Sequence, residues 1–411
     1  MHKQNDSIYK ILQVNKFHWL KGGSEAVYFS EAAMLRKHKH KVVNFSVKNE
    51  NNLPDDYDKY FIDEVDYDAP ELLKKISNAV KIIYNFDAKS KIKNLLNNES
   101  FDIAHLHNFQ HQISPSIFRP LKKHGIPLVL SIHDLKSICP NYKMYTKGHV
   151  CEECKEAKFY KCVLNSCTKR SKLKSAINMI EMYFHHLKKY YTMIDKFIAV
   201  SQFYKDKFIE FGFSNEKIVY IPNFINCQEF VFKNEDDGYA LYFGRLAEEK
   251  GLHTLLRASA LRPDIPLIVV GTGPEQIKLK KLANELNLKN VTFLGYKYGN
   301  ELRSLISNAS FTILASEWYE NCPMSILESL AFGTPVIGSN MGGIPELIVE
   351  GIDGLTFKAG DQYDLAHKME KLWNDKSLRE SMAQYGREKI EKRFTEENHY
   401  NKLMEVYREI T

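Results

Sequence analysis

Residues 310–340 read "SFTILASEWYENCPMSILESLAFGTPVIGSN", and this stretch decides the fold class. Its two ends, "SFTILAS" and "PVIGSN", have the apolar composition of buried strands. Between them, Pro323 suits the start of a helix and Gly333 suits its end. A helix between two buried strands is the repeating unit of a parallel sheet. The stretch therefore predicts an α/β domain.

The same alternation recurs through most of the chain. A first series of apolar runs is expected to form strands at 9–15, 41–47, 101–108, 126–134, 195–203 and 217–225. A second series is expected at 239–246, 266–273, 290–296, 310–316, 335–340 and 354–357. A polar, irregular segment at 226–240 separates them. We expect an α/β fold of two Rossmann-like, doubly wound domains in tandem that face a central cleft.

Composition narrows the functional classes. The chain has 411 residues, of which 44% are hydrophobic and 26% are charged, as in ordinary globular proteins. Its formal net charge of +6 fits an anionic ligand or an anionic membrane surface. No run approaches the ~18 apolar residues that span a bilayer, and the N-terminus lacks a long apolar core. We expect a cytoplasmic protein.

Two loops have the composition of phosphate-binding loops. In "GRLAEEKG" at 244–251, Arg245 and Lys250 lie between a strand and the next helix, where a helix dipole and cations favour a diphosphate. In "KGGSE" at 21–25, the paired glycines allow close backbone approach, and Ser24 is expected to cap the following helix. Neither loop is a Walker motif or a G-x-G-x-x-G fingerprint. Solvated loops or plain turns would also account for each loop alone.

The opening stretch adds two carboxylates. Glu320 precedes the predicted helix and Glu328 lies within it, while the N–H groups of Met324 and Ser325 are free donors in its first turn. Carboxylates accept hydrogen bonds from sugar hydroxyls. The pattern predicts a diphosphate at the helix start with a hydroxyl-binding carboxylate on each side. A cap and a surface residue are the alternative interpretation.

These motifs together resemble a known family. The ordered set is "KGGSE", "SIHD", "GRLAEEKG", "VVGTGP", "EWYENCPMSILE" and "GTPVIGSNMGGIPELI". It resembles the retaining glycosyltransferases of family 4, which have the GT-B fold, over nearly the whole chain. The resemblance implies transfer from a UDP- or GDP-sugar to a glycan or lipid-linked acceptor in surface polysaccharide biosynthesis. It implies no cofactor for catalysis.

The resemblance also implies roles for individual residues. Glu320 matches a glutamate that contacts the donor sugar, and Glu328 matches one that binds the ribose. Arg245 and Lys250 match the pair that holds the diphosphate. His133 matches a histidine near the donor sugar, so His133 and Glu320 are the expected catalytic residues.

The remaining expected donor-binding residues belong to two loops. Gly22 and Gly23 match the phosphate-side loop of the first domain, and Asn321, Met324 and Ser325 belong to the loop and helix start after Glu320. This second loop reads Asn-Cys-Pro where many members have a glycine-rich run. Pro at 323 has no N–H, so one hydrogen-bond donor is missing.

The expected domain limits follow from the same comparison. They are 1–225 for an acceptor-side domain, 226–393 for a nucleotide-sugar-binding domain, and 394–411 for a C-terminal helix that returns to the first domain. A cysteine-rich insertion occupies 139–167, as in a subset of related sugar transferases.

The insertion holds five of the seven cysteines. Cys151 and Cys154 have the spacing of a zinc knuckle, and Cys162 and Cys167 are the expected second pair of ligands. Two interpretations stay open: a structural zinc ion, or a loop of reduced thiols.

A basic segment at 168–191 follows, with apolar residues between its lysines. It suits a helix packed on the first domain, or an interfacial helix that makes a peripheral contact with the inner face of an anionic membrane. The insertion and this helix also fit a zinc-knuckle nucleic-acid-binding protein on a Rossmann-like scaffold. That alternative leaves the ordered motifs unexplained, so we expect no nucleic-acid partner.

Overall fold

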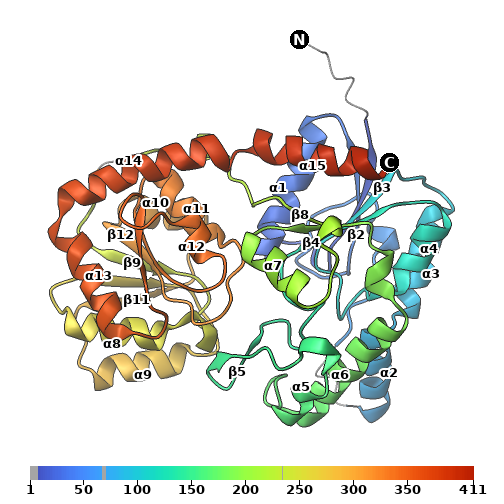
Figure 1. Cartoon of the computed structure of the whole chain (residues 1–411), viewed down its shortest axis with the longest axis horizontal. Helices are drawn as coiled ribbons and strands as arrows, with labels where there is room; N and C mark the ends of the chain where they lie inside the picture. Colours follow the sequence, from blue (N-terminus) through green and yellow to red (C-terminus); the bar gives the residue numbers. More distant parts are fainter. Residues whose placement is uncertain (1–7, 67–70, 234) are drawn as a thin grey trace.

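The computed structural model describes residues 8–66, 71–233 and 235–411. They form two lobes, each built on a parallel sheet with helices on both faces (Figure 1). The α/β class and the two Rossmann-like, doubly wound units are as predicted. The expected domain limits stay predictions.

The first lobe contains a six-stranded parallel sheet within the described residues, in the order β2-β1-β3-β4-β7-β8. Its strands are β1 (Lys10–Val14), β2 (Lys41–Phe45), β3 (Ile103–Leu106), β4 (Leu128–Ile132), β7 (Lys196–Ala199) and β8 (Ile218–Tyr220). Its helices are α1 (Gly23–Lys37), α2 (Leu72–Ile83), α3 (Phe86–Leu96), α4 (Phe118–Lys123), α6 (Lys172–Leu187) and α7 (Gln202–Glu210).

The second lobe contains a matching sheet in the order β11-β10-β9-β12-β13-β14. Its strands are β9 (Ala240–Phe243), β10 (Leu267–Val270), β11 (Val291–Gly295), β12 (Phe311–Leu314), β13 (Val336–Ser339) and β14 (Gly354–Phe357). Its helices are α8 (Leu252–Leu261), α9 (Gln276–Glu285), α10 (Gly299–Ser307), α11 (Met324–Phe332), α12 (Ile344–Leu347), α13 (Gln362–Asn374) and α14 (Lys376–Arg393).

Each sheet divides its apolar side chains between two cores, because alternate residues of a strand point to opposite faces. In β1, Leu12 packs in the core that contains residues of α3, α4 and α7, whereas Ile11 packs in the core under α1. In β9, Tyr242 lies in the core with α8 and α13, and Leu241 lies in the core with α10 and α11. Burial on both faces explains why the strands appear as nearly continuous apolar runs.

The C-terminal helices connect the lobes. Helix α14 packs on α11 in the second lobe, and α15 (Glu396–Ile410) follows it onto the first (Figure 1). In α15, Leu403 and Tyr407 are fully buried beside Ile11 and Met34 of the first lobe.

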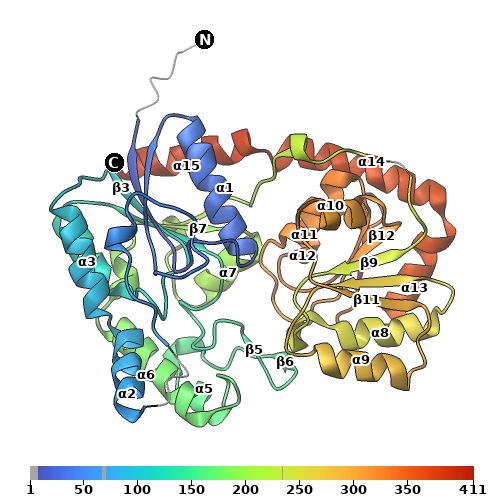
Figure 2. The same ribbon diagram turned by 180° about the vertical axis from the view of Figure 1, so that it is seen from behind.

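The cysteine-rich insertion contains an antiparallel hairpin, β5 (Tyr145–Thr146) and β6 (His149–Val150), and the short α5 (Lys161–Leu164). Figure 2 shows the hairpin between the lobes. The insertion contacts the second lobe directly, since Lys143 Nζ lies 2.6 Å from a carboxylate oxygen of Glu249.

One local prediction is wrong. Ser24 does not cap α1, because the helix already begins at Gly23 and Gly22 is its N-cap residue. The Ser24 hydroxyl instead donates to the carboxylate of Glu25. The predicted limits of the helix after Glu320 are confirmed, since α11 follows Pro323 and ends at Gly333 in a left-handed conformation.

Candidate active site

Both sheets reverse their strand order at one point, and the predicted loops lie there. In the first sheet the reversal falls between β1 and β3, and the Gly22–Gly23 loop follows β1. In the second it falls between β9 and β12; Arg245 and Lys250 follow β9, and Glu320 follows β12. Ligands of open α/β sheets bind at the carboxyl ends of strands at such points.

Glu320 is a buried carboxylate held by three donors. Its Oε1 accepts from Lys250 Nζ at 2.6 Å, from Ser316 Oγ at 2.5 Å and from Trp318 Nε1 at 2.9 Å. Burial alone would raise the pKa of Glu320, but the Lys250 charge and these bonds lower the pKa below its usual value. Glu320 is therefore ionised at neutral pH. Its Oε2 has no hydrogen-bond partner among the described residues, which leaves this atom to accept from a hydroxyl.

The backbone fixes the position of Lys250. The residue ends a 3-10 turn over Glu248–Lys250, and Gly251 follows with φ of +66°. A Cβ on Gly251 would lie 1.9 Å from the carbonyl oxygen of Ala315. Glycine is required at this position, because only glycine combines a left-handed conformation with so close an approach.

Positive charge from both lobes converges on this region. Burial and the charges of Lys16 and Arg245 lower the pKa of Lys21, so the Arg245 guanidinium lies within electrostatic reach of the first lobe. Arg245 is exposed and has no side-chain partner among the residues that the structure describes. An exposed, unpaired guanidinium beside a lysine is suited to a bidentate contact with a phosphate.

The loop of the first lobe faces the start of α11. A Cβ on Gly23 would lie 3.9 Å from Met324 Cγ. The N–H groups of Met324 and Ser325 lie in the first turn of α11, and no side chain caps that end. The structure thus brings together the predicted Gly22, Gly23, Met324, Ser325, Lys250 and Glu320.

Asn321 joins the two lobes. Its Nδ2 donates to the carbonyl oxygen of Ile132 at 2.8 Å, and its Oδ1 accepts from Ser201 Oγ at 2.7 Å. Both polar ends of the amide are therefore engaged by the first lobe. Glu346 adds a second link, because its carboxylate accepts from the N–H groups of Gln202 and Phe203 at the start of α7. Donor binding by Asn321 stays a prediction.

Glu328 differs from Glu320 in having no hydrogen-bond partner among the described residues. It lies in the second turn of α11, and burial raises its pKa to about 7, although Arg303 opposes the shift. The residue is half-buried, and a partly desolvated carboxylate without donors is costly, so hydroxyl groups of a bound ligand would stabilise its ionised form.

His133 follows β4 and is half-buried. Its Nε2 lies 2.9 Å from Nδ1 of His107, and burial and the neighbouring His107 lower its pKa to about 3. Behind His107 lies Glu31 of α1, whose carboxylate is also 2.9 Å from His105 Nδ1. Glu31, His105 and His107 were not predicted from the sequence, although "HLH" at the end of a predicted strand was a usable signal.

The five clustered cysteines lie close enough to influence one another. Burial and the neighbouring Cys139, Cys167 and Cys151 raise the pKa of Cys154. Tetrahedral zinc requires sulfur atoms at about 2.3 Å from the ion. Among the described residues, one group of three possible metal ligands has its ligand atoms within 4.8 Å of one another, and it consists of Glu31, His105 and His107. No three of the clustered cysteines lie that close together. Zinc binding stays a prediction.

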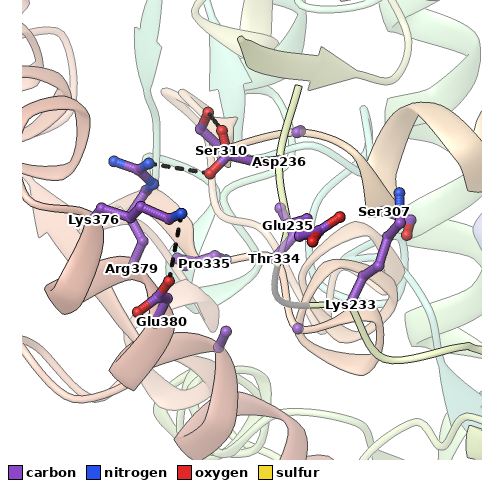
Figure 3. A pocket seen from close by; sticks show the side chains of 13 residues that line it. Lys233, Glu235, Asp236, Ser307, Ser310, Thr334, Pro335, Lys376, Arg379 and Glu380 are labelled. Carbon is purple, nitrogen blue, oxygen red and sulfur yellow. Dashed lines mark hydrogen bonds and ion pairs between the residues drawn. The ribbon is translucent and has the colours of Figure 1, made fainter. Parts of the chain in front are cut away.

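A separate hollow lies outside the described site. Figure 3 shows Asp236, Ser310 and Arg379 pointing toward one another in the second lobe. Asp236 bridges the other two, at 2.6 Å from Ser310 Oγ and 3.1 Å from Arg379. None of the predicted site residues lines this hollow. The bonds of Asp236 fasten the start of the second lobe to α14, while Arg379 Nε is buried without a hydrogen-bond partner among the described residues.

Comparison with protein families gives two matches. The sequence model of Glycosyltransferase Family 4 matches residues 21–229, half of the chain, and that of Glycosyl transferases group 1 matches residues 226–389. An uncharacterised glycosyltransferase of Methanocaldococcus jannaschii is 29% identical over 221 residues, 54% of this chain and 61% of that protein. A lipopolysaccharide core biosynthesis glycosyltransferase of Rhizobium meliloti is 32% identical over 163 residues, 39% of this chain and 47% of that protein. The chain thus spans about half to three-fifths of the length of these relatives.

Solved structures share the fold. The Anabaena HepE protein in complex with UDP and glucose has a TM-score of 0.68 at 17% identity, covering 98% of this chain and 100% of that one. The sucrose-phosphate synthase of Thermosynechococcus elongatus has a TM-score of 0.72 at 19% identity, covering 98% of both chains. The two sheets therefore have the GT-B arrangement.

The raised pKa of Glu328 predicts a pH-dependent stability. A carboxyl with a pKa near 7 when folded and near 4.5 when unfolded destabilises the native state increasingly as pH rises from 4.5 to 7, and fully above 7. Glu328→Gln should therefore raise the free energy of unfolding at pH 8, by about 3 kcal/mol at most, and change nothing at pH 4.5. Urea unfolding at both pH values measures this. The exposed Glu405→Gln is the control, and equal stability of Glu328→Gln and wild type at pH 8 would contradict the assignment.

The zinc interpretation predicts a metal content. Protein purified without chelator should contain about one zinc per chain if the second cysteine pair closes the site. Cys151→Ser should lose that zinc, whereas Cys227→Ser, outside the insertion, should keep it. Mass spectrometry measures the zinc content of each protein. Zinc well below one per chain in the wild type would contradict the zinc interpretation and favour a loop of reduced thiols.

Proposed function

The chain belongs to glycosyltransferase family 4, and we propose that it transfers a sugar from a nucleotide-diphosphate sugar with retention of configuration at the anomeric carbon. One observation carries the proposal. At the strand-order reversal of the second sheet, an ionised Glu320 with one open oxygen adjoins Lys250 and the uncapped start of α11. The carboxylate suits sugar hydroxyls, and the cation with the free N–H groups suits a diphosphate.

The proposed reaction breaks the bond between the anomeric carbon and the β-phosphate oxygen. Negative charge then grows on the leaving nucleoside diphosphate, and Arg245, Lys250 and the N-terminal N–H groups of α11 stabilise it. The acceptor oxygen forms the new bond on the same face of the sugar, and its proton passes to the leaving diphosphate. These protein cations supply the charge that this step needs.

Glu320 and His133 have distinct roles in this proposal. Glu320 holds the donor sugar through Oε2, since Oε1 already accepts three hydrogen bonds. His133 orients the donor or the acceptor through its remaining ring nitrogen. Glu328 binds the ribose, which provides the donors that its carboxylate lacks.

UDP-glucose is the first donor to test. The Anabaena HepE protein, which shares the fold, has been solved with UDP and with UDP-glucose. For the acceptor we propose a glycan or a lipid-linked sugar in surface polysaccharide biosynthesis. The Rhizobium relative, whose description names lipopolysaccharide core biosynthesis, supports this class.

We also propose that α6 contacts an anionic membrane. Its inner side packs on the first lobe, as the packing interpretation predicts: Met182 lies against Phe159 and Cys162 of the insertion, and His185 Nε2 lies 2.8 Å from the carbonyl oxygen of Ile83 in α2. Its outer side carries Leu173, Ile180 and Leu187, which are 74%, 49% and 77% exposed and repeat every seven residues on one face. Exposed lysines flank the stripe at both ends of the helix, so the outer face is apolar and basic. Among the described helices, none is long and apolar enough to cross a bilayer.

The nucleic-acid-binding alternative has no support from the family matches. The insertion and the basic segment that suggested it both contact the second lobe: Glu152 of the insertion accepts from Tyr319, and Arg170 of the basic segment pairs with Glu248. These contacts give the segment a role in holding the two lobes together.

The transfer proposal predicts loss of turnover in site variants with the fold intact. Glu320→Ala and His133→Ala should each lower release of UDP from UDP-glucose by at least about tenfold, because each loses a contact made to the reacting sugar. Near-normal turnover in either variant would contradict the role of that residue. If the wild type is inactive with UDP-glucose, the same assay with GDP-sugars identifies the donor.

The diphosphate contact predicts weaker nucleotide binding. Arg245→Ala should weaken UDP binding by about 10- to 100-fold, since a charge-assisted hydrogen bond contributes about 1.5–3 kcal/mol. Calorimetric titration measures the affinity. Arg257→Ala, an exposed arginine of α8 in the same lobe, is the matched control and should bind as the wild type does. Equal affinities of Arg245→Ala and wild type would contradict the assignment.

The membrane proposal predicts sedimentation with phosphatidylglycerol-containing vesicles and not with pure phosphatidylcholine. Ile180→Glu should abolish it by adding negative charge to the apolar stripe. Ile277→Glu, on an 83% exposed residue of α9 in the other lobe, should leave it unchanged. Wild-type protein that stays in the supernatant contradicts the membrane contact.

A further inference from the structure

A buried chain of polar side chains leads from α1 to His133. It begins at the carboxylate of Glu31, which is 2% exposed, and continues through the fully buried ring of His107 to His133. The distances are 3.4 Å from Glu31 Oε1 to His107 Nε2 and 2.9 Å from His107 Nδ1 to His133 Nε2. The rings of His107 and His133 are stacked, with an interplanar angle of 15°.

Glu31 is the fixed end of this chain. Burial alone would raise its pKa, but His105 and His107 hold the pKa well below its usual value, so the group is a carboxylate. Its Oε1 accepts from Gln13 Nε2 at 3.1 Å and lies 2.9 Å from His105 Nδ1. Its Oε2 lies 3.5 Å from His399 Nε2 of α15. A carboxylate can only accept hydrogen bonds, so every nitrogen that bonds to it must carry a proton.

This constraint determines which nitrogen of His107 carries its proton. Burial lowers the pKa values of His107 and His133, so both rings are neutral and each has one N–H. A proton on His107 Nε2 can bond to Glu31 Oε1. In the other tautomer, the lone pair of Nε2 would face the negatively charged carboxylate, so the proton on Nε2 is favoured. The second N–H of Gln13 Nε2, at 3.5 Å from His107 Nε2, would favour the reverse tautomer, but this neutral contact is longer than the 3.4 Å contact to the charged Glu31 oxygen, so the carboxylate outweighs it.

The tautomer of His107 determines that of His133. With its proton on Nε2, His107 has only a lone pair on Nδ1, which must accept from His133 Nε2. His133 then has its lone pair on Nδ1, an atom without a hydrogen-bond partner in the described part of the chain. The open nitrogen of His133 is therefore an acceptor.

We propose that Glu31 and His107 are positioning residues that lock His133 in the Nε2-protonated tautomer, so that its Nδ1 accepts a hydrogen bond from a hydroxyl of the bound sugar. The inference rests on the proposed sugar-transfer function for its ligand, but the tautomer itself is a property of the free protein. Hydroxyl donors and an acceptor nitrogen are complementary, whereas an N–H at Nδ1 would favour a phosphate or carbonyl oxygen. The arrangement thus selects for a hydroxyl at this position.

The test is nitrogen NMR of the full-length protein labelled at histidine with 15N, without any ligand. Long-range nitrogen–proton correlations distinguish Nδ1–H from Nε2–H rings, and His133→Gln identifies the His133 signals by their absence. The wild type should show His133 with Nε2–H over Nδ1–H by about tenfold or more, as expected for one net hydrogen bond. A wild-type His133 protonated on Nδ1 overturns the proposal, whether or not any variant folds.

Glu31→Gln is the decisive variant, because its amide has nearly the same shape and can donate to His107 Nε2. The ratio of His133 tautomers should fall toward about one to one or reverse, with melting monitored as a control for folding. His105→Asn, which loses a different bond to Glu31, should leave the His133 tautomer unchanged. An unchanged His133 tautomer in folded Glu31→Gln overturns the proposal. The sugar-transfer proposal is tested by UDP-glucose turnover in His133→Ala, whereas the tautomer is measured in the protein without any ligand. Each proposal can therefore fail without the other.

Discussion

The bond between Lys250 and Glu320 is the interaction on which the site depends. A carboxylate that is only 6% exposed stays ionised when a cation and hydrogen-bond donors surround it, and Lys250, Ser316 and Trp318 supply them. These residues come from the segments after β9 and β12, which are neighbours only because the sheet reverses its strand order between them. The doubly wound topology therefore brings Lys250 and Glu320 together. Gly251 allows the turn that contains Lys250 to approach the end of β12 closely.

The second constraint is that the two lobes must meet at the carboxyl ends of their sheets. Asn321 and Glu346 bind backbone groups of the first lobe, and the cysteine-rich insertion reaches the second through Lys143. Helix α15 also ties the C-terminus to the first lobe, because Tyr407 OH lies 2.7 Å from Nδ1 of His105. The end of the chain is thus in contact with the histidine network behind His133.

The sequence was sufficient to predict the parts that depend on local pattern. All twelve strands of the two sheets lie within predicted apolar runs, because strands buried on both faces are apolar throughout. The ends of α11 were predictable from Pro323 and Gly333. The Glu31–His107–His133 chain was not, since Glu31 lies on a helix far from the histidines in sequence and no spacing rule links them. Likewise, Asn321 was expected to bind the donor, and its contacts to Ile132 and Ser201 depend on the docking of the lobes.

The central claim is that the meeting point of the two sheets binds a nucleoside diphosphate, and melting of the purified protein with UDP, GDP, ADP, CMP and NAD tests it most directly. A ligand at 100 times its dissociation constant adds about 2.7 kcal/mol, which raises the melting temperature by several degrees. We expect such a rise with one nucleoside diphosphate, UDP or GDP, and none with NAD. No rise with any nucleotide would contradict it.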